Sequence, residues 1–139
     1  MAAEATRAGY GETLIELVEE GKDIMAVEAD LSGSTTTAKL GKAYPERLVN
    51  VGIAEQNMID VAAGLALAGK TVFTGSFAAF GTGRCYDQIR NTVCYSDLNV
   101  KVAPTHAGVT VGPDGGSHQM LEDVSLMRGL PGMSVLVPA

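Results

Sequence analysis

The sequence predicts an α/β fold, a mostly parallel sheet with helices on both faces. Short apolar runs of strand length alternate with longer segments of helical spacing along the whole chain, and this alternation is typical of helix-covered parallel sheets. The chain has 139 residues, which at roughly 150 residues per domain leaves no room for a second core. We therefore expect one domain over residues 1–139.

The elements are expected in the following order. Leu14, Leu17 and Val18 recur at helical spacing, and Gly21 ends that helix. The helices are predicted over residues 10–20, 54–68, 77–95 and 121–128, and the strands over residues 24–27, 47–51, 71–74, 100–103 and 135–137.

Three loops separate these elements, over residues 29–37, 75–80 and 105–119. The first is polar and follows directly after a buried strand, which is where α/β sheets bind their ligands. The third is Gly-rich and carries both histidines of the chain. A long loop without regular structure inside a compact domain is usually functional.

Charge and hydropathy exclude several classes of protein. The formal net charge is −6, from 16 acidic and 10 basic residues, and no Lys/Arg cluster is present that would bind nucleic acid or an anionic membrane. The longest apolar stretch, residues 61–69, is far shorter than the roughly 20 residues of a membrane span. Residues 1–12 contain no apolar core of a secretory signal. We expect a cytoplasmic protein.

The two cysteines are expected to be core thiols in a reducing compartment. Cys85 and Cys94 fall in one predicted helix, on opposite faces and roughly 13 Å apart, which is too far for a disulfide. They form no CxxC motif and have no nearby histidine, so a metal site is not expected.

Residues 64–71 match the phosphate-loop pattern G-x-x-x-x-G-K-[ST]. A phosphate loop runs from a strand into a helix, so that the helix N-terminus faces the phosphates. Here a helix ends and a strand begins, so Gly69 is interpreted as a helix C-cap. No strand is followed by a nicotinamide fingerprint either.

The segment Gly52-Ile-Ala-Glu-Gln-Asn-Met58 places Glu55 in the first turn of an apolar helix. One interpretation is a carboxylate that stabilises the helix dipole. The other is a functional acid, because a carboxyl group that faces an apolar pocket can hold or pass a proton near neutral pH.

Five sequence blocks occur in a characteristic order and spacing: Ala-Asp-Leu-Ser-Gly-Ser at 29–34, Gly-Ile-Ala-Glu-Gln-Asn at 52–57, Ser-Phe-Ala-Ala-Phe at 76–80, Asp-Gln-Ile-Arg at 87–90 and Pro-Asp-Gly-Gly-Ser-His-Gln at 113–119. Together they resemble the pyrimidine-binding domain of transketolase over nearly the whole chain. The resemblance implies the thiamine-diphosphate-binding fold in its pyrimidine-binding form.

The resemblance also implies how thiamine diphosphate is bound and activated. Glu55 matches the residue that bonds N1′ of the aminopyrimidine and so enables the cofactor's amino group to deprotonate the thiazolium C2. Phe77 and Phe80 match the aromatic residues that pack on this ring. Asp30 and Leu31 match contacts from the neighbouring loop.

For the sugar phosphate, the resemblance implies a set of polar contacts. Arg7, Ser34 and His106 match positions that hold the phosphate, and Asp114 and His118 match positions that meet the hydroxyl groups. Glu55 and His118 are the predicted catalytic residues. Arg84 is a further substrate candidate, because a related arginine serves the substrate in deoxyxylulose-phosphate synthases. A zinc site at His106 and His118 is not expected, since no third ligand accompanies them.

The chain departs from the family pattern in three ways. Gly81-Thr82-Gly83 replaces bulkier residues and a shorter spacing. The Gly-Asp-Gly motif and downstream Asn that hold Mg²⁺ on the diphosphate-binding domain are missing, and so is the smaller C-terminal domain. We therefore expect the partner domain to hold Mg²⁺ and this chain to hold no metal.

The resemblance predicts that the chain is a module of a transketolase. Because Arg7 lies close to the start of the chain, a split enzyme is expected. Assembled with a diphosphate-binding subunit, it would transfer two-carbon ketol units between ketose and aldose phosphates, as in the pentose phosphate pathway. Alone it is expected to be inactive. The expected assembly is a homo-oligomer, or a heterotetramer with that subunit.

Two alternatives remain. A deoxyxylulose-phosphate synthase shares the fold and Ala-Glu-Gln, but His106 and the Phe-Ala-Ala-Phe block favour transketolase. A non-catalytic scaffold of a thiamine enzyme would have no use for Glu55 together with the polar set.

Overall fold

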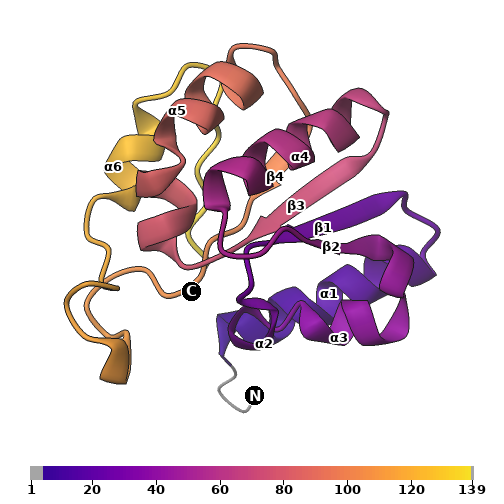
Figure 1. Cartoon of the computed structure of the whole chain (residues 1–139), viewed down its shortest axis with the longest axis horizontal. Coiled ribbons are helices and arrows are strands. Elements are labelled where there is room, and N and C mark those ends of the chain that lie inside the picture. Colours follow the sequence, from indigo (N-terminus) through magenta and orange to yellow (C-terminus); the bar gives the residue numbers. More distant parts are fainter. Residues whose placement is uncertain (1–4, 139) are drawn as a thin grey trace.

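The computed structural model describes residues 5–138 and contains a four-stranded, all-parallel sheet. Its strand order is β2-β1-β3-β4 (Figure 1). The strands are β1 (Ile24–Glu28), β2 (Leu48–Asn50), β3 (Thr71–Gly75) and β4 (Val100–Val102). The predicted fold class is therefore confirmed.

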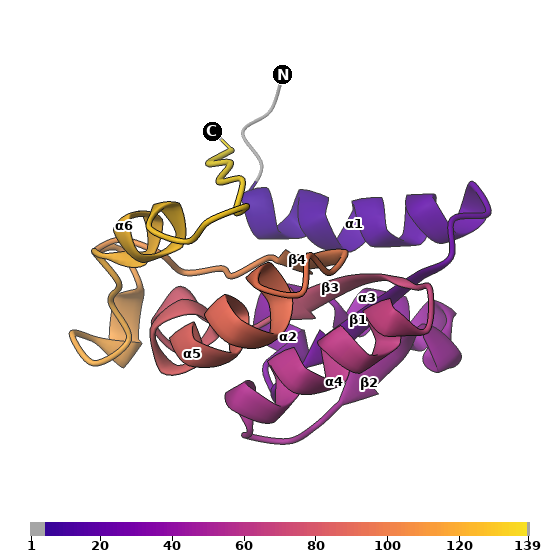
Figure 2. The same ribbon diagram turned by 90° about the horizontal axis from the view of Figure 1, so that it is seen from above.

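Helices cover both faces of this sheet. The α-helices are α1 (Thr6–Glu19), α2 (Ser32–Thr35), α3 (Ala38–Ala43), α4 (Glu55–Leu67), α5 (Tyr86–Gln88) and α6 (Asp123–Arg128). Figures 1 and 2 both show α1 and α4 on opposite sides of the strands. Within the part of the chain that the structure describes, no helix is long and apolar enough to cross a membrane.

Alternation along β1 builds two separate cores. Ile24 and Ala26 pack with Leu14 of α1 and Leu40 of α3 on one face. On the other face, Val27 packs in the larger core, which includes residues of α4, β3, the segment after β3 and α6. Because successive strand residues point to opposite faces, one apolar strand supports both helical layers.

The phosphate-loop exclusion is confirmed, because α4 ends before Gly69 and β3 begins at Thr71. Gly69 has φ +91°, and its N–H donates to the carbonyl of Ala66 at 2.9 Å, while Lys70 N–H donates to Leu65 at 3.1 Å. This is a helix C-cap in the left-handed conformation.

The prediction of one regular helix over residues 77–95 is wrong. Two π-helical turns, η2 (Ala79–Arg84) and η3 (Ile89–Cys94), flank the short α5. A π turn accommodates one extra residue in a helix, and η2 contains the Gly81-Thr82-Gly83 segment that lengthens the spacing after Phe80.

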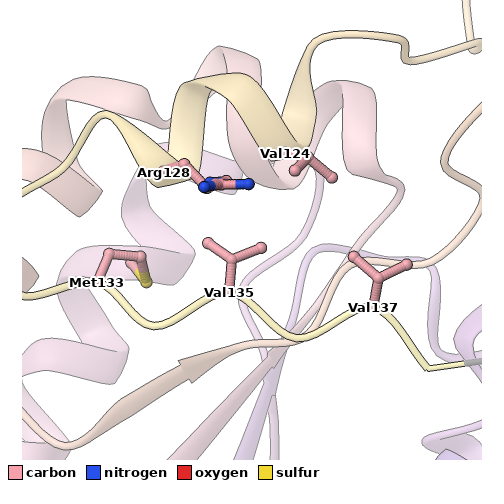
Figure 3. Close-up of a pocket in the computed structure, with 5 residues that line it drawn as sticks. All are labelled: Val124, Arg128, Met133, Val135 and Val137. Atoms are coloured by element: carbon pink, nitrogen blue, oxygen red, sulfur yellow. The ribbon is translucent and has the colours of Figure 1, made fainter.

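Two further expectations were wrong. The loop over residues 29–37 contains α2, and the 3₁₀ turn η1 (Pro45–Arg47) precedes β2. The strand expected over residues 135–137 does not form; the segment instead lines a shallow pocket beside α6, with Val124, Arg128, Met133, Val135 and Val137 around it (Figure 3). It adds no ladder of backbone bonds to the sheet.

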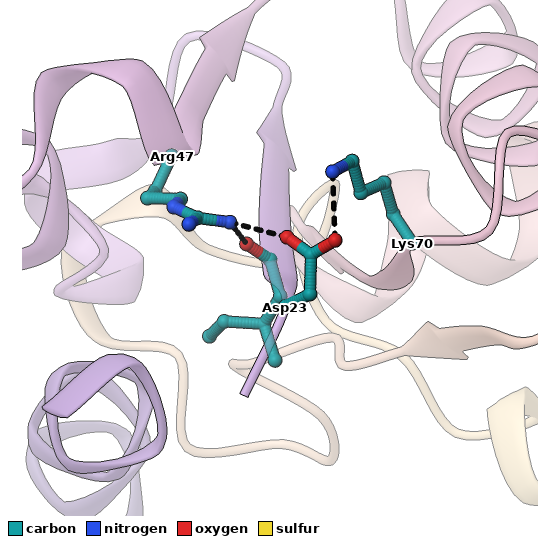
Figure 4. A network of polar contacts seen from close by, with 4 residues as sticks. Asp23, Arg47 and Lys70 are labelled. Atoms are coloured by element: carbon teal, nitrogen blue, oxygen red, sulfur yellow. Dashed lines mark hydrogen bonds and ion pairs between the residues drawn. The ribbon is translucent and has the colours of Figure 1, made fainter. Parts of the chain in front are cut away.

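The amino ends of three strands are joined by charges. Asp23, just before β1, pairs with Arg47 (2.6 Å) before β2 and with Lys70 (2.7 Å) before β3 (Figure 4). Hydrogen bonds from Lys70 and then from Arg47 lower the pKa of Asp23. This network lies at the amino edge of the sheet, opposite the carboxyl ends of the strands.

Candidate functional site

The predicted site residues gather at the carboxyl edge of the sheet. Asp30 follows β1, Glu55 follows β2, Phe77 follows β3 and His106 follows β4. The chain leaves β1 toward β2 on one side and returns to β3 on the other. Such a switch in strand order opens a crevice between the loops of adjacent strands, where α/β proteins bind ligands.

Glu55 begins α4 and its side chain is only 4% exposed. Oε1 accepts a hydrogen bond from Nη1 of Arg84 at 2.9 Å, and the Arg84 side chain is 48% exposed. The guanidinium carbon also lies 4.4 Å from the centroid of the Phe80 ring. Arg84 therefore bridges the buried carboxyl and an aromatic face, as an ion pair and a cation–π contact.

A small hollow opens beside this ion pair. It is lined by the strand-to-helix junction after β2 and by the arginine: Ile53, Ala54, Glu55, Gln56, Asn57 and Arg84. Gln56 Nε2 donates to the carbonyl of Arg84 at 3.3 Å, which links this junction to η2.

Four rings form an aromatic group next to Arg84. Phe77 stacks on His106 with centroids 3.9 Å apart, and lies nearly parallel to Phe80 at 6.3 Å. His118 meets the edge of Phe80 at 5.1 Å and of Phe77 at 6.1 Å. The edge-on arrangement of His118 against both phenylalanines is one that aromatic quadrupoles favour.

His106 is also the centre of a polar group. Arg7 Nη1 lies 3.3 Å from Nε2 of His106 and 3.4 Å from the carbonyl of Ser34. Since guanidinium only donates, Nε2 accepts and the proton of the neutral ring is on Nδ1, facing Thr105 Oγ1 at 2.8 Å. Desolvation lowers the pKa of His106, Arg7 lowers it further, and Asp114 opposes this.

The long third loop brings His118 and Asp114 to the site. An antiparallel bridge between Gly108 and Met120 closes it, and the 3₁₀ turn η4 (Gly112–Asp114) lies within it. Ser117 Oγ lies 2.9 Å from Nδ1 of His118. His118 thus joins the aromatic group, whereas Asp114 is connected to the polar group through its charge effect on the pKa of His106.

Asp30 is exposed and Leu31 is half-buried after β1. Asp30 has φ +63°, and its N–H donates to Oδ1 of Asn50 at 3.1 Å while Asn50 Nδ2 donates back to Asp30 Oδ1 at 3.3 Å. Asn50 Oδ1 also accepts from the N–H of Gly52 at 3.0 Å. One amide side chain therefore fixes the loops after both β1 and β2.

Comparison with known proteins identifies the family and agrees with the fold. The family model for the transketolase pyrimidine-binding domain matches residues 2–139. The chain belongs to this family.

Two relatives of this chain are named as a section or a subunit of a transketolase. A Methanocaldococcus jannaschii protein provisionally named a transketolase C-terminal section is 57% identical, over 95% of this chain and 42% of its own length. A 6-deoxy-6-sulfo-D-fructose transketolase subunit from Clostridium sp. strain MSTE9 is 43% identical, over 95% and 41%. The chain thus spans about two fifths of these relatives.

A solved structure described as an inactive β4 tetramer of a split-gene transketolase is also similar. It matches with a TM-score of 0.79 and 51% identity, over 94% of this chain and 41% of that chain. Human transketolase is 39% identical over 97% of this chain and 22% of its own length.

Transketolases use thiamine diphosphate with a divalent metal, and the residues present fit the pyrimidine part of that cofactor. A buried carboxyl is joined through Arg84 to the ring of Phe80, and aromatic faces of this kind can pack on a flat heterocycle. No group of three or more His, Cys, Asp or Glu side chains in residues 5–138 is arranged to hold a metal ion.

The sequence prediction missed residues beneath the site. Glu28 extends β1 by one residue and is fully buried, and its Oε1 accepts hydrogen bonds from Thr35 and Thr37 at 2.6 Å each. Burial raises the pKa of Glu28 to about 6, although the two threonine hydrogen bonds oppose this. An acidic residue that directly follows an apolar strand was the available signal.

Proposed function

We propose that this chain is the pyrimidine-binding module of a split transketolase, which transfers two-carbon ketol units between sugar phosphates. The observation that carries the proposal is the buried Glu55 carboxyl, which Arg84 joins to the ring of Phe80 next to Phe77. A carboxyl that serves only the helix dipole does not need to be buried.

In this proposal the chain supplies the groups that bind and protonate the aminopyrimidine. When bound, thiamine diphosphate supplies the thiazolium carbon that carries the ketol unit. Glu55 exchanges a proton with N1′ of the pyrimidine, Phe77 and Phe80 offer apolar faces that exclude water, and Asp30 and Leu31 contact the ring from the loop after β1.

The substrate is assigned to the polar group. Arg7, Ser34 and His106 converge from α1, α2 and the loop after β4, and the guanidinium of Arg7 is a charge-assisted donor of the kind that a dianionic phosphate favours. Asp114 and His118 are assigned to the hydroxyl groups, with His118 as a second catalytic residue. Arg84 remains a candidate substrate contact that here pairs with Glu55.

The partner is a diphosphate-binding subunit that also holds Mg²⁺. The divided relatives support this assignment, since the chain matches only part of proteins named as sections or subunits. The chain alone is proposed to be inactive, and the assembly is proposed to be a homo-oligomer or a heterotetramer.

The decisive experiment compares Glu55→Gln with wild type in the assembly with the diphosphate-binding subunit. Gln keeps the size and one acceptor oxygen but cannot exchange a proton. We expect ketol transfer from xylulose 5-phosphate to ribose 5-phosphate to fall by at least about 100-fold, within the usual range for losing an acid–base group.

Glu16→Gln is the matched control, because Glu16 is an exposed residue of α1. Near-normal turnover of Glu55→Gln would overturn the assignment. Product formation from pyruvate and glyceraldehyde 3-phosphate, in place of ketol transfer, would favour the deoxyxylulose-phosphate synthase reaction instead.

A further inference from the structure

Glu28 occupies a costly position at the end of β1. Its side chain is fully buried on the face shared with Ile24 and Ala26, and no hydrogen-bond partner in residues 5–138 reaches its Oε2. A carboxyl in such a place loses hydration that one pair of hydroxyls only partly replaces. An apolar residue of similar size would fill the space more cheaply.

The neighbouring strand is adapted to this carboxyl. Glu28 is the register partner of Gly75 on β3, and a Cβ added at Gly75 would overlap the carboxyl group. The glycine therefore provides the space in which Oε1 of Glu28 can meet both Thr35 and Thr37.

The hydrogen bonds from Thr35 and Thr37 to Glu28 fix Thr36, which lies between them in the chain. Thr36 ends α2 in the left-handed conformation with φ +71°, which is strained for a β-branched residue. With Thr35 and Thr37 directed inward to Glu28, Thr36 faces α1. There it packs so closely against Gly11 that no Cβ would fit.

Thr36 in turn holds the residue that approaches His106. Its hydroxyl donates a hydrogen bond to the backbone carbonyl of Arg7. The guanidinium of Arg7 then reaches the Ser34 carbonyl and the His106 ring. Glu28 is thus connected to Arg7 through the threonines, without touching the polar group itself.

We propose that Glu28 is a positioning residue for the phosphate end of the substrate: through Thr35 and Thr37 it fixes Thr36, and through Thr36 it places Arg7 beside Ser34 and His106. This inference rests on the proposed function. It predicts that damage to the buried network weakens recognition of the phosphate group and leaves the ketol-transfer step intact.

The test uses Glu28→Gln and Thr37→Val in the assembled enzyme, with xylulose 5-phosphate and unphosphorylated xylulose as alternative donors. We expect KM for the phosphorylated donor to rise about tenfold with kcat within about twofold, because the lost interaction is uniform binding. The value of kcat/KM for xylulose should not change.

Arg7→Ala completes a double-mutant cycle. If Glu28 acts through Arg7, Glu28→Gln adds little to the KM of the Arg7→Ala enzyme. Thr92→Val is the matched control, since its hydroxyl also bonds a carboxylate, Asp60 at 3.1 Å, but far from the site on η3. Equal losses with both donors, or additive effects with Arg7→Ala, would overturn the inference.

A second measurement separates this inference from the proposed function. Amide hydrogen exchange in residues 34–37 of the chain should be at least about tenfold faster in Glu28→Gln than in wild type, because the network that orders them is weakened. Unchanged exchange overturns the inference. If the wild-type assembly is inactive while exchange in the variant is faster, the proposed function is overturned. The assignment of the network to the substrate phosphate is then overturned with it.

Discussion

The buried carboxyl of Glu28 makes a defined prediction about the pH dependence of stability. Burial raises its pKa from 4.5 to about 6 in the folded chain, so the folded state holds this proton more tightly than the unfolded state. Folding therefore gains stability from Glu28 below pH 4.5, and this contribution is lost as the pH rises to about 6. A difference of about 1.5 units corresponds to roughly 2 kcal/mol.

Glu28→Gln removes the titration and keeps the size of the side chain. The free energy of unfolding of the variant, minus that of wild type, should rise by about 2 kcal/mol between pH 4 and pH 8. The change with pH is the decisive quantity, because the new amide also adds buried N–H donors that shift the difference equally at every pH.

Urea unfolding at unit steps of pH measures this difference. The groups that face Glu28 are Tyr10 of α1, whose own pKa is raised, first by burial and then by the charge of Glu28, and the hydroxyls of Thr35 and Thr37. Tyr10 stays neutral throughout this range. Parallel curves for wild type and variant would refute the reasoning.

Two further predictions concern Gly75, which is the register partner of Glu28, and the two cysteines. Gly75→Ala should lower the free energy of unfolding by about 2–4 kcal/mol in urea, since its methyl group overlaps the Glu28 carboxyl, whereas Gly64→Ala in open space on α4 should raise it by about 0.5–1 kcal/mol. Burial raises the pKa of the Cys85 thiol to about 12, so iodoacetamide at pH 8 should modify the half-buried Cys94 first and Cys85 only after unfolding; equal rates in the folded chain would contradict this.

The strands and the main helices could be predicted because their signals are local. β1 and β3 are short apolar runs, and α4 combines Ala-rich helical spacing with a glycine stop. The direction of each element along the chain was enough to reject the phosphate loop. Local pattern also placed Glu55, Phe77 and His106 at the ends of three strands, where a parallel sheet brings them together.

The remaining features depend on contacts that no local pattern contains. α2 has the sequence Ser-Gly-Ser-Thr, without apolar periodicity, and its last residue bonds to Glu28 in the strand before it. Apolar residues 135–137 have the composition of a strand, yet Leu136 stays 89% exposed. A strand needs a neighbour's backbone as well as a propensity.

Departures from local rules are concentrated at the edge of the sheet that carries the site. Of the four non-glycine residues with positive φ in residues 5–138, Asp30, Thr36 and His106 follow β1 or β4 at the carboxyl edge. The unpartnered oxygen of Glu28 lies there as well. At the amino edge, by contrast, Asp23 is exposed and both its oxygens are paired. Backbone strain persists where a function maintains it, so the grouping of these three strained residues supports the location of the site independently of the family.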